Sequence, residues 1–100
     1  LYADMETCKQ FNYSVAYCLE KGEYVVKEAS ISKLKSTKMA DEVIYECLQF
    51  LGGYGYMEDY PLARLLRDSR LGPIGGGTSE ILREIIAKIV IDKKSYRPVT

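Results

Sequence analysis

The sequence predicts an all-α protein, built as an antiparallel up-and-down four-helix bundle. Four segments place apolar residues at spacings of three and four, which is the pattern of a helix with one buried face. No segment sustains the alternation of apolar and polar residues that is typical of a strand. The connections between the segments are short, which favours antiparallel neighbours. We expect the bundle to occupy residues 1–92 and residues 93–100 to form a polar tail.

The first helix is expected from Leu1 to about Lys21. Its apolar positions are Leu1, Met5, Cys8, Phe11, Val15, Cys18 and Leu19. Gly22 is expected to end this helix, because glycine readily adopts the positive φ that follows a last helical turn.

The second helix is expected from about Glu23 to Leu51, a stretch without Pro or Gly. A helix of roughly 28 residues would be about 42 Å long. Its solvent-facing side is expected to consist of Lys33, Lys35, Lys38, Asp41 and Glu42. Glycines at positions 52 and 53 are expected to end it and to begin an aromatic-rich turn through Met57.

Two shorter helices complete the predicted bundle. Pro61 suits the first turn of a third helix, which we expect to end near Arg70. Residues 71–77 contain four glycines and a proline, which a helix does not cross. Thr78 is a good N-cap for a fourth helix that extends to Val90.

Composition excludes several kinds of protein. Fourteen Lys and Arg balance fourteen Asp and Glu, so no strong field attracts the chain to nucleic acid or to an anionic membrane. The absence of His excludes Ser-His-Asp triads, Cys-His dyads and His-bearing zinc sites within this chain. The three cysteines lack C-x-x-C spacing, which argues against a disulfide framework. No apolar run reaches the roughly 18 residues of a membrane span. We therefore expect no metal, nucleic acid or membrane span.

Three local patterns bear on chemistry. Residues 75–80 (GGGTSE) open a helix, and they predict either an anion site at free backbone N–H groups or a flexible connector. Residues 49–56 (QFLGGYGY) predict either an aromatic-packed helix end or a backbone edge that closely approaches a cofactor. Arginines 64, 67 and 70 surround Asp68, which favours ion pairs that join the third helix to its neighbours.

Four motifs, taken in order, resemble the C-terminal helical domain of acyl-CoA dehydrogenases. They are residues 49–56 (QFLGGYGY), 60–61 (YP), 66–70 (LRDSR) and 74–81 (IGGGTSEI). Their order and spacing match the family from about Ala29 to Val90, and the first helix fits it more loosely. The pattern resembles the isovaleryl-CoA and long-chain subgroup, which has no glutamate in the glycine loop.

The resemblance implies a flavoenzyme that removes two hydrogens from the α and β carbons of an acyl-CoA thioester. A carboxylate takes the α proton and FAD accepts the β hydride. Such enzymes have an N-terminal helical domain, a β domain and this helical bundle. They are homo-oligomers, dimers or tetramers, with FAD at a subunit interface and an electron-transfer flavoprotein as acceptor. The resemblance fits a mitochondrial matrix or a bacterial cytoplasm.

The family's cofactor contacts can be carried over by position. Gln49 and Gly53 match contacts to the adenosine and pyrophosphate end of a neighbouring subunit's FAD, and the same segment contains Phe50, Leu51 and Gly52. Matching FAD contacts at the start of the last helix are Thr78, Ser79 and Glu80. Substrate positions beside the thioester are Gly76 and Gly77.

One departure from the family concerns the catalytic base. Many members have a glutamate at the position of Gly76, and glycine cannot act as a base. Two explanations remain. The catalytic base lies on a helix before Leu1, or the parent protein is a family relative with altered chemistry. We therefore expect no catalytic residue in this chain. The chain lacks the family's upstream helix and its two other domains, so we expect it to be inactive alone and to self-associate. The alternatives are a non-catalytic helical interaction module and an oxidase-type relative.

Overall fold

The computed structural model describes residues 1–97, and every regular element within them is a helix. This confirms the all-α prediction. The helices are α1 (Tyr2–Glu20), α2 (Val26–Leu51), α3 (Gly53–Tyr56), α4 (Pro61–Ser69) and α5 (Ser79–Val90). The last three residues of the expected polar tail lie outside the described residues. No helix of the described part is both long and apolar enough to cross a membrane.

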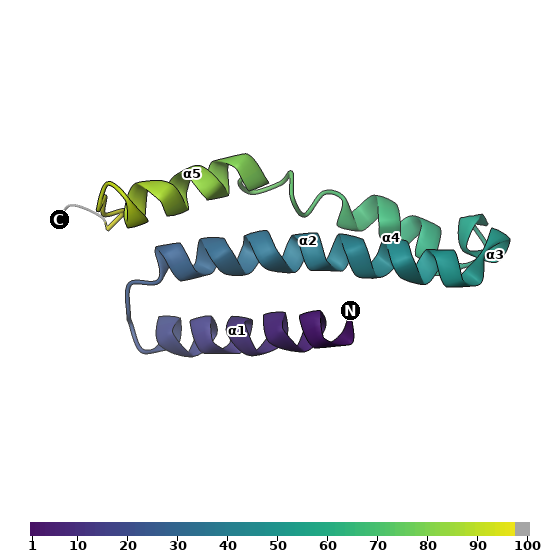
Figure 1. Ribbon diagram of the computed structural model, residues 1–100, viewed down its shortest axis with the longest axis horizontal. Helices are drawn as coiled ribbons and strands as arrows, with labels where there is room; N and C mark the ends of the chain where they lie inside the picture. Colours follow the sequence, from purple (N-terminus) through teal and green to yellow (C-terminus); the bar gives the residue numbers. More distant parts are fainter. Residues whose placement is uncertain (98–100) are drawn as a thin grey trace.

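The long helix α2 lies at the centre of the molecule (Figure 1). Helix α1 runs along one side of α2, while α4 and α5 follow one another along the other side, both antiparallel to α2. Helix α2 contacts each of the other four helices, whereas α1 contacts only α2 among the described helices. The four longer helices therefore lie in three rows rather than four, because the chain continues in one direction between α4 and α5. The molecule measures 54 × 23 × 22 Å.

The boundary between α1 and α2 follows from Gly22. Its φ is +82°, and its N–H donates to the carbonyl of Leu19 at 3.0 Å. The next N–H, of Glu23, donates to the carbonyl of Cys18 at 3.1 Å. These two bonds form a Schellman motif, which ends α1 where the sequence predicts. Because Glu23 is bound into this motif, α2 begins three residues later than expected, at Val26.

The aromatic-rich turn after α2 contains one helical turn, α3, that the sequence did not predict. Gly52 separates α3 from α2 with a φ of +58°, a conformation that favours glycine. Gly55 of α3 is buried against Leu48 of α2, so closely that an added Cβ would lie 2.5 Å from the Leu48 carbonyl oxygen. Two glycines therefore allow the chain to reverse within a few residues and to begin α4.

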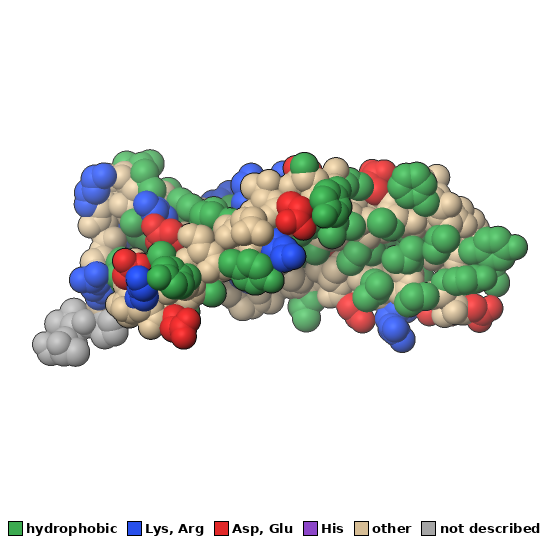
Figure 2. All heavy atoms as spheres, turned by 90° about the horizontal axis from the view of Figure 1, so that it is seen from below, with side chains coloured by type: hydrophobic (Ala, Val, Ile, Leu, Met, Phe, Trp, Pro, Cys, Tyr) green, Lys and Arg blue, Asp and Glu red, His purple; other side chains and the backbone are tan. Residues whose placement is uncertain are grey.

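The buried core of the described chain is small. Its buried hydrophobic residues are Val15, Val25, Ala63 and Leu82. Large apolar side chains lie on the surface instead, and Phe50 and Tyr56 are 87% and 84% exposed. Figure 2 shows hydrophobic side chains gathered at the end formed by α3 and the last turns of α2. Apolar surface on this scale is typical of a face that packs against another polypeptide.

Candidate functional site: the glycine loop and the end of α2

The loop between α4 and α5 is held in a defined shape by its own backbone. The N–H of Gly75 donates to the carbonyl of Leu71 at 2.7 Å, and the N–H of Ser79 donates to the carbonyl of Pro73 at 3.1 Å. Gly76 and Gly77 have φ values of +66° and +107°. Residues with side chains rarely adopt such angles, so the conformation of the loop favours glycine at both positions. The loop therefore has a defined backbone conformation in this structure.

The start of α5 uses two of its backbone donors internally. The Thr78 hydroxyl accepts a hydrogen bond from the N–H of Ile81 at 3.2 Å, which confirms Thr78 as the N-cap. The N–H of Ser79 is taken by the loop. Glu80 is exposed in the first turn, where a carboxylate suits the helix dipole. An anion at this helix end would thus meet fewer free donors than the sequence interpretation assumed.

Lys33 of α2 contacts the glycine loop. Its ammonium donates hydrogen bonds to the carbonyl oxygens of Gly75 and Gly77, and the second of these measures 2.6 Å. The expectation that Lys33 faces solvent was therefore wrong. The same holds for Asp41, whose carboxylate accepts a hydrogen bond from the Ser69 hydroxyl of α4 at 2.7 Å.

The remaining polar residues expected on that side of α2, Lys35, Lys38 and Glu42, are exposed. The helical spacing contains a signal that could have identified Lys33 as a residue that does not face solvent. Lys33 lies three residues after the buried Ser30 and four residues before Thr37. Residues at these spacings share one face of a helix, so Lys33 lies on the same face as both. Charge alone had suggested solvent exposure.

The second predicted contact region is the end of α2. Its five residues are all exposed: Gln49, Phe50, Leu51, Gly52 and Gly53. The Gln49 side chain makes no hydrogen bond within residues 1–97, so its amide is available to a ligand. From position 33, beside the glycine loop, to position 49 the helix rises about 24 Å. The two predicted cofactor segments are therefore separate regions of this chain (Figure 1).

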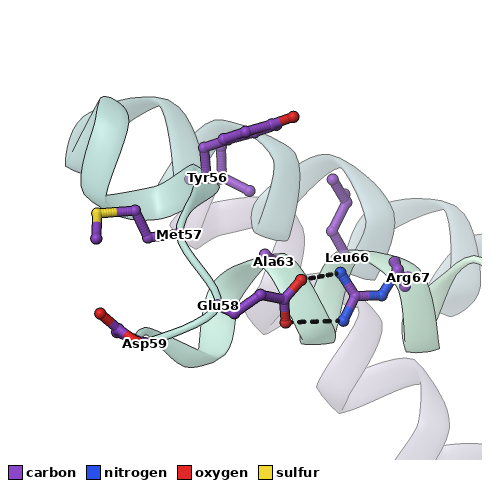
Figure 3. A pocket seen from close by; sticks show the side chains of 8 residues that line it. Tyr56, Met57, Glu58, Asp59, Ala63, Leu66 and Arg67 are labelled. Atoms are coloured by element: carbon purple, nitrogen blue, oxygen red, sulfur yellow. Dashed lines mark hydrogen bonds and ion pairs between the residues drawn. The ribbon is translucent and has the colours of Figure 1, made fainter.

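A groove of about 590 Å³ lies beside this end of α2, between α3 and α4 (Figure 3). At its edge the Arg67 guanidinium forms a bidentate ion pair with Glu58, at 3.0 and 3.2 Å. The hydrogen bonds from Arg67 hold the pKa of the Glu58 carboxyl below its ordinary value. Arg67 thus pairs with the segment before its own helix, and not with a neighbouring helix as the sequence had suggested.

The glycine loop supplies backbone groups to this region, and the two helix ends supply a few side chains. The glycine loop contains no side chain that could act as a base, because positions 75–77 are all glycine. Within residues 1–97 no group of three or more metal-binding side chains comes together. The loop offers backbone donors, α5 offers the exposed Glu80, and the end of α2 offers Gln49.

The sequence matches one family along nearly its whole length. The profile described as "Acyl-CoA dehydrogenase, C-terminal domain" covers residues 1–91. Isovaleryl-CoA dehydrogenase of Bos taurus is 38% identical over 88 residues, which are 88% of this chain and 21% of the relative. The long-chain specific acyl-CoA dehydrogenase of Sus scrofa is 44% identical over 66 residues, 66% of this chain and 15% of the relative. The chain thus spans about a fifth of the length of these curated relatives.

Solved structures agree with the sequence comparison. A probable acyl-CoA dehydrogenase from Mycobacterium abscessus superposes with a TM-score of 0.87 at 36% identity, over 89% of this chain and 24% of that chain. A structure titled as the electron transferring flavoprotein of Acidaminococcus fermentans gives a TM-score of 0.86 at 27% identity, over 90% of this chain and 24% of that chain.

Proposed function

This chain belongs to the acyl-CoA dehydrogenase family, and we propose that it is the C-terminal helical domain of a flavoenzyme that oxidises acyl-CoA thioesters. In the proposed reaction the substrate loses a proton from its α carbon and a hydride from its β carbon, and a carbon–carbon double bond forms. The observation that carries the proposal is the family match across residues 1–91. Relatives of the isovaleryl-CoA and long-chain types support the subgroup.

The residues present fit a flavin cofactor at the two contact regions. Gln49 exposes a free amide, and Gly52 and Gly53 expose backbone with nothing within 4 Å of an added Cβ. Thr78, Ser79 and Glu80 form the other contact segment, at the start of α5. Because the two segments lie apart on one chain, we propose that each contacts a different FAD, one of them bound mainly by a neighbouring subunit. Bound FAD would supply the hydride acceptor for the reaction.

The glycine loop would bind the substrate and leave proton abstraction to another part of the protein. Gly76 and Gly77 would lie beside the thioester, where backbone N–H groups can donate to its carbonyl oxygen. Since Gly76 has no side chain, the catalytic carboxylate is proposed to lie outside these residues. The exposed apolar end near Phe50 and Tyr56 fits burial in a homo-oligomer or against the other domains.

The rest of the proposal concerns the whole protein. Residues 1–92 would form the domain and residues 93–100 a tail. An electron-transfer flavoprotein would accept the electrons, and the protein would work in a mitochondrial matrix or a bacterial cytoplasm. Relatives named as mitochondrial support the first of these two locations.

A second candidate function is the reverse direction, reduction of an activated double bond by reduced flavin. The 3-(aryl)acrylate reductase of Clostridium sporogenes is 42% identical over 89 residues, 85% of this chain and 24% of the relative. A substrate of this second kind would be a 3-arylacrylate or its thioester.

Anaerobic flavin spectroscopy on the intact protein that contains this chain tests these candidates. Saturated acyl-CoA is expected to bleach the visible flavin band. A band that stays oxidised with every acyl-CoA, but returns when a 3-arylacrylate is added to the chemically reduced protein, would favour the reductase instead. Oxygen consumption during turnover would identify an oxidase-type relative. Absence of flavin would overturn the proposal in favour of an interaction module.

A single substitution tests the cofactor segment. Gln49→Ala is expected to weaken FAD retention about tenfold, because a hydrogen bond from a positioned amide to the cofactor would be lost. Glu46→Ala is the matched control, since Glu46 is exposed one turn earlier on the same helix. FAD dissociation can be measured by the recovery of flavin fluorescence. Equal retention in both variants would contradict the assignment of Gln49.

A further inference from the structure

We propose that Lys33 is a positioning residue, which holds the glycine loop so that the backbone N–H groups of Gly76 and Thr78 face the substrate. The proposal rests on the function proposed above. It is carried by the convergence of two loop carbonyls on one ammonium group. Lys33 lies on α2 and hydrogen-bonds to the loop through these carbonyls, so it acts on the site through the backbone.

The geometry of the peptide bond gives the direction of the donors. In a planar trans peptide the C=O and the following N–H point in opposite directions. The carbonyls of Gly75 and Gly77 both point at the Lys33 ammonium. The N–H groups of Gly76 and Thr78 must then point away from α2. Neither of them has a hydrogen-bond partner within residues 1–97, so both are free to bind a ligand oxygen.

The positive φ values of the loop account for this arrangement. Gly76 and Gly77 adopt +66° and +107°, which brings carbonyls two residues apart onto the same side of the loop. Two carbonyl dipoles that point together repel each other unless a cation lies between them. Lys33 supplies that cation, half-buried and without an ion-pair partner among the described residues. Without the ammonium, neither the peptide before Gly76 nor the peptide before Thr78 would keep a hydrogen bond within residues 1–97.

Two substitutions of Lys33 separate its charge from its length. Lys33→Met keeps the aliphatic length and removes the charge, whereas Lys33→Arg keeps a charged donor that can bridge two carbonyls. Lys38→Met is the control, because Lys38 is exposed on the same helix and its side chain makes no hydrogen bond within residues 1–97. All three are made in the intact flavin-containing protein.

The first measurement is peptide-level hydrogen exchange across residues 72–80. Lys33→Met is expected to speed exchange there at least tenfold, with little change in α1. The second measurement is kcat/KM for acyl-CoA, which is expected to fall at least tenfold with Lys33→Met. Lys33→Arg is expected to recover most of both losses, and Lys38→Met to behave as the unmodified protein.

Each result decides the proposal separately from the function on which it rests. Unchanged exchange in Lys33→Met would overturn the claim that Lys33 holds the loop. Faster exchange with an unchanged kcat/KM, or no recovery by Lys33→Arg, would overturn the positioning role. If the unmodified protein never reduces its flavin with acyl-CoA, the proposed function fails and the positioning role fails with it. Faster hydrogen exchange of residues 72–80 in Lys33→Met would then still support the contact between Lys33 and the loop.

Discussion

Arg67 and Glu58 illustrate how a surface ion pair can orient a segment while contributing little to stability. The side chains are 59% and 73% exposed, and exposed pairs are well screened by water. Their two parallel hydrogen bonds nevertheless fix the connection between α3 and α4 beside the groove of Figure 3. The pair therefore matters for the shape of this end of the molecule more than for its free energy of unfolding.

Arg67→Met is expected to raise the pKa of Glu58 towards its ordinary value. The hydrogen bonds from Arg67 are the largest cause of the lowered pKa, followed by its charge, while Arg64 contributes least. Because the pKa is lower in the folded state, the pair stabilises the fold above the unfolded-state pKa of Glu58. That stabilisation is lost as the pH falls through the folded-state pKa. NMR titration of the Glu58 carboxyl measures the change.

Arg64→Met is the control for this titration. It removes the same charge from the same helix without touching the hydrogen bonds, so its effect on the pKa of Glu58 is expected to be smaller. Equal effects of the two substitutions would show that general charge, and not the bidentate contact, sets the pKa.

At the scale of single elements, α5 depends on its N-cap. Thr78→Ala is expected to lower the free energy of unfolding by about 1 kcal/mol, because the N–H of Ile81 would lose its acceptor. Thr78→Ser keeps the hydroxyl and is expected to change stability by much less. Urea unfolding of both variants measures the difference. A loss with Thr78→Ser as large as that with Thr78→Ala would contradict the cap and indicate packing of the threonine methyl group instead.

Local sequence signals predict most helix boundaries, because the groups that decide them are neighbours in sequence. Gly22 ends α1, Pro61 begins α4 and Thr78 begins α5, each through contacts within a few residues. Helix α3 was not predicted, since two of its four residues are glycine, which opposes helix formation. Its conformation depends on packing of Gly55 against Leu48, and local preference does not contain that information.

The candidate site was predictable only in part, for the same reason. Motif spacing identified the glycine loop and the end of α2. It did not identify Lys33, whose partners lie more than forty positions later in the chain. It also did not indicate that Arg67 pairs with Glu58. Contacts between distant segments follow from the tertiary arrangement, and one sequence read by periodicity does not define that arrangement.

At the scale of the whole molecule, α2 holds together the outer helices α1, α4 and α5, which do not contact each other in the described part of the chain. Different polar contacts link α2 to α1, to α4 and to the loop before α5: Asn12 of α1 to Ser36, Asp41 to Ser69 of α4, and Lys33 to the carbonyl of Gly77. Helix α1 makes no contact with α4 or α5 in the described part of the chain. Local opening of one outer row is therefore expected to leave the other closed.

Asn12→Ala tests this independence. The Asn12 amide donates to Ser36 at 3.0 Å and its carbonyl oxygen accepts from Ser32 and Ser36, so the substitution leaves half-buried hydroxyls without a partner across the α1–α2 contact. Such a loss costs about 1–3 kcal/mol, so exchange of α1 amides is expected to speed at least fivefold. Amides of α5 should change by less than about twofold, since α1 and α5 do not contact each other in the described part of the chain.

Thr7→Val is the control for this experiment, because the Thr7 hydroxyl donates only to Ala3 of its own helix, at 2.8 Å. It is expected to leave exchange of both α1 and α5 nearly unchanged. If Asn12→Ala instead speeds α5 as much as α1, then α2 must open together with both rows and the molecule unfolds as one unit. A response confined to α1 would mean that the glycine loop and α5 keep their geometry when the opposite row opens. A partner that packs against α1 would then leave the conformation of the glycine loop and α5 unchanged.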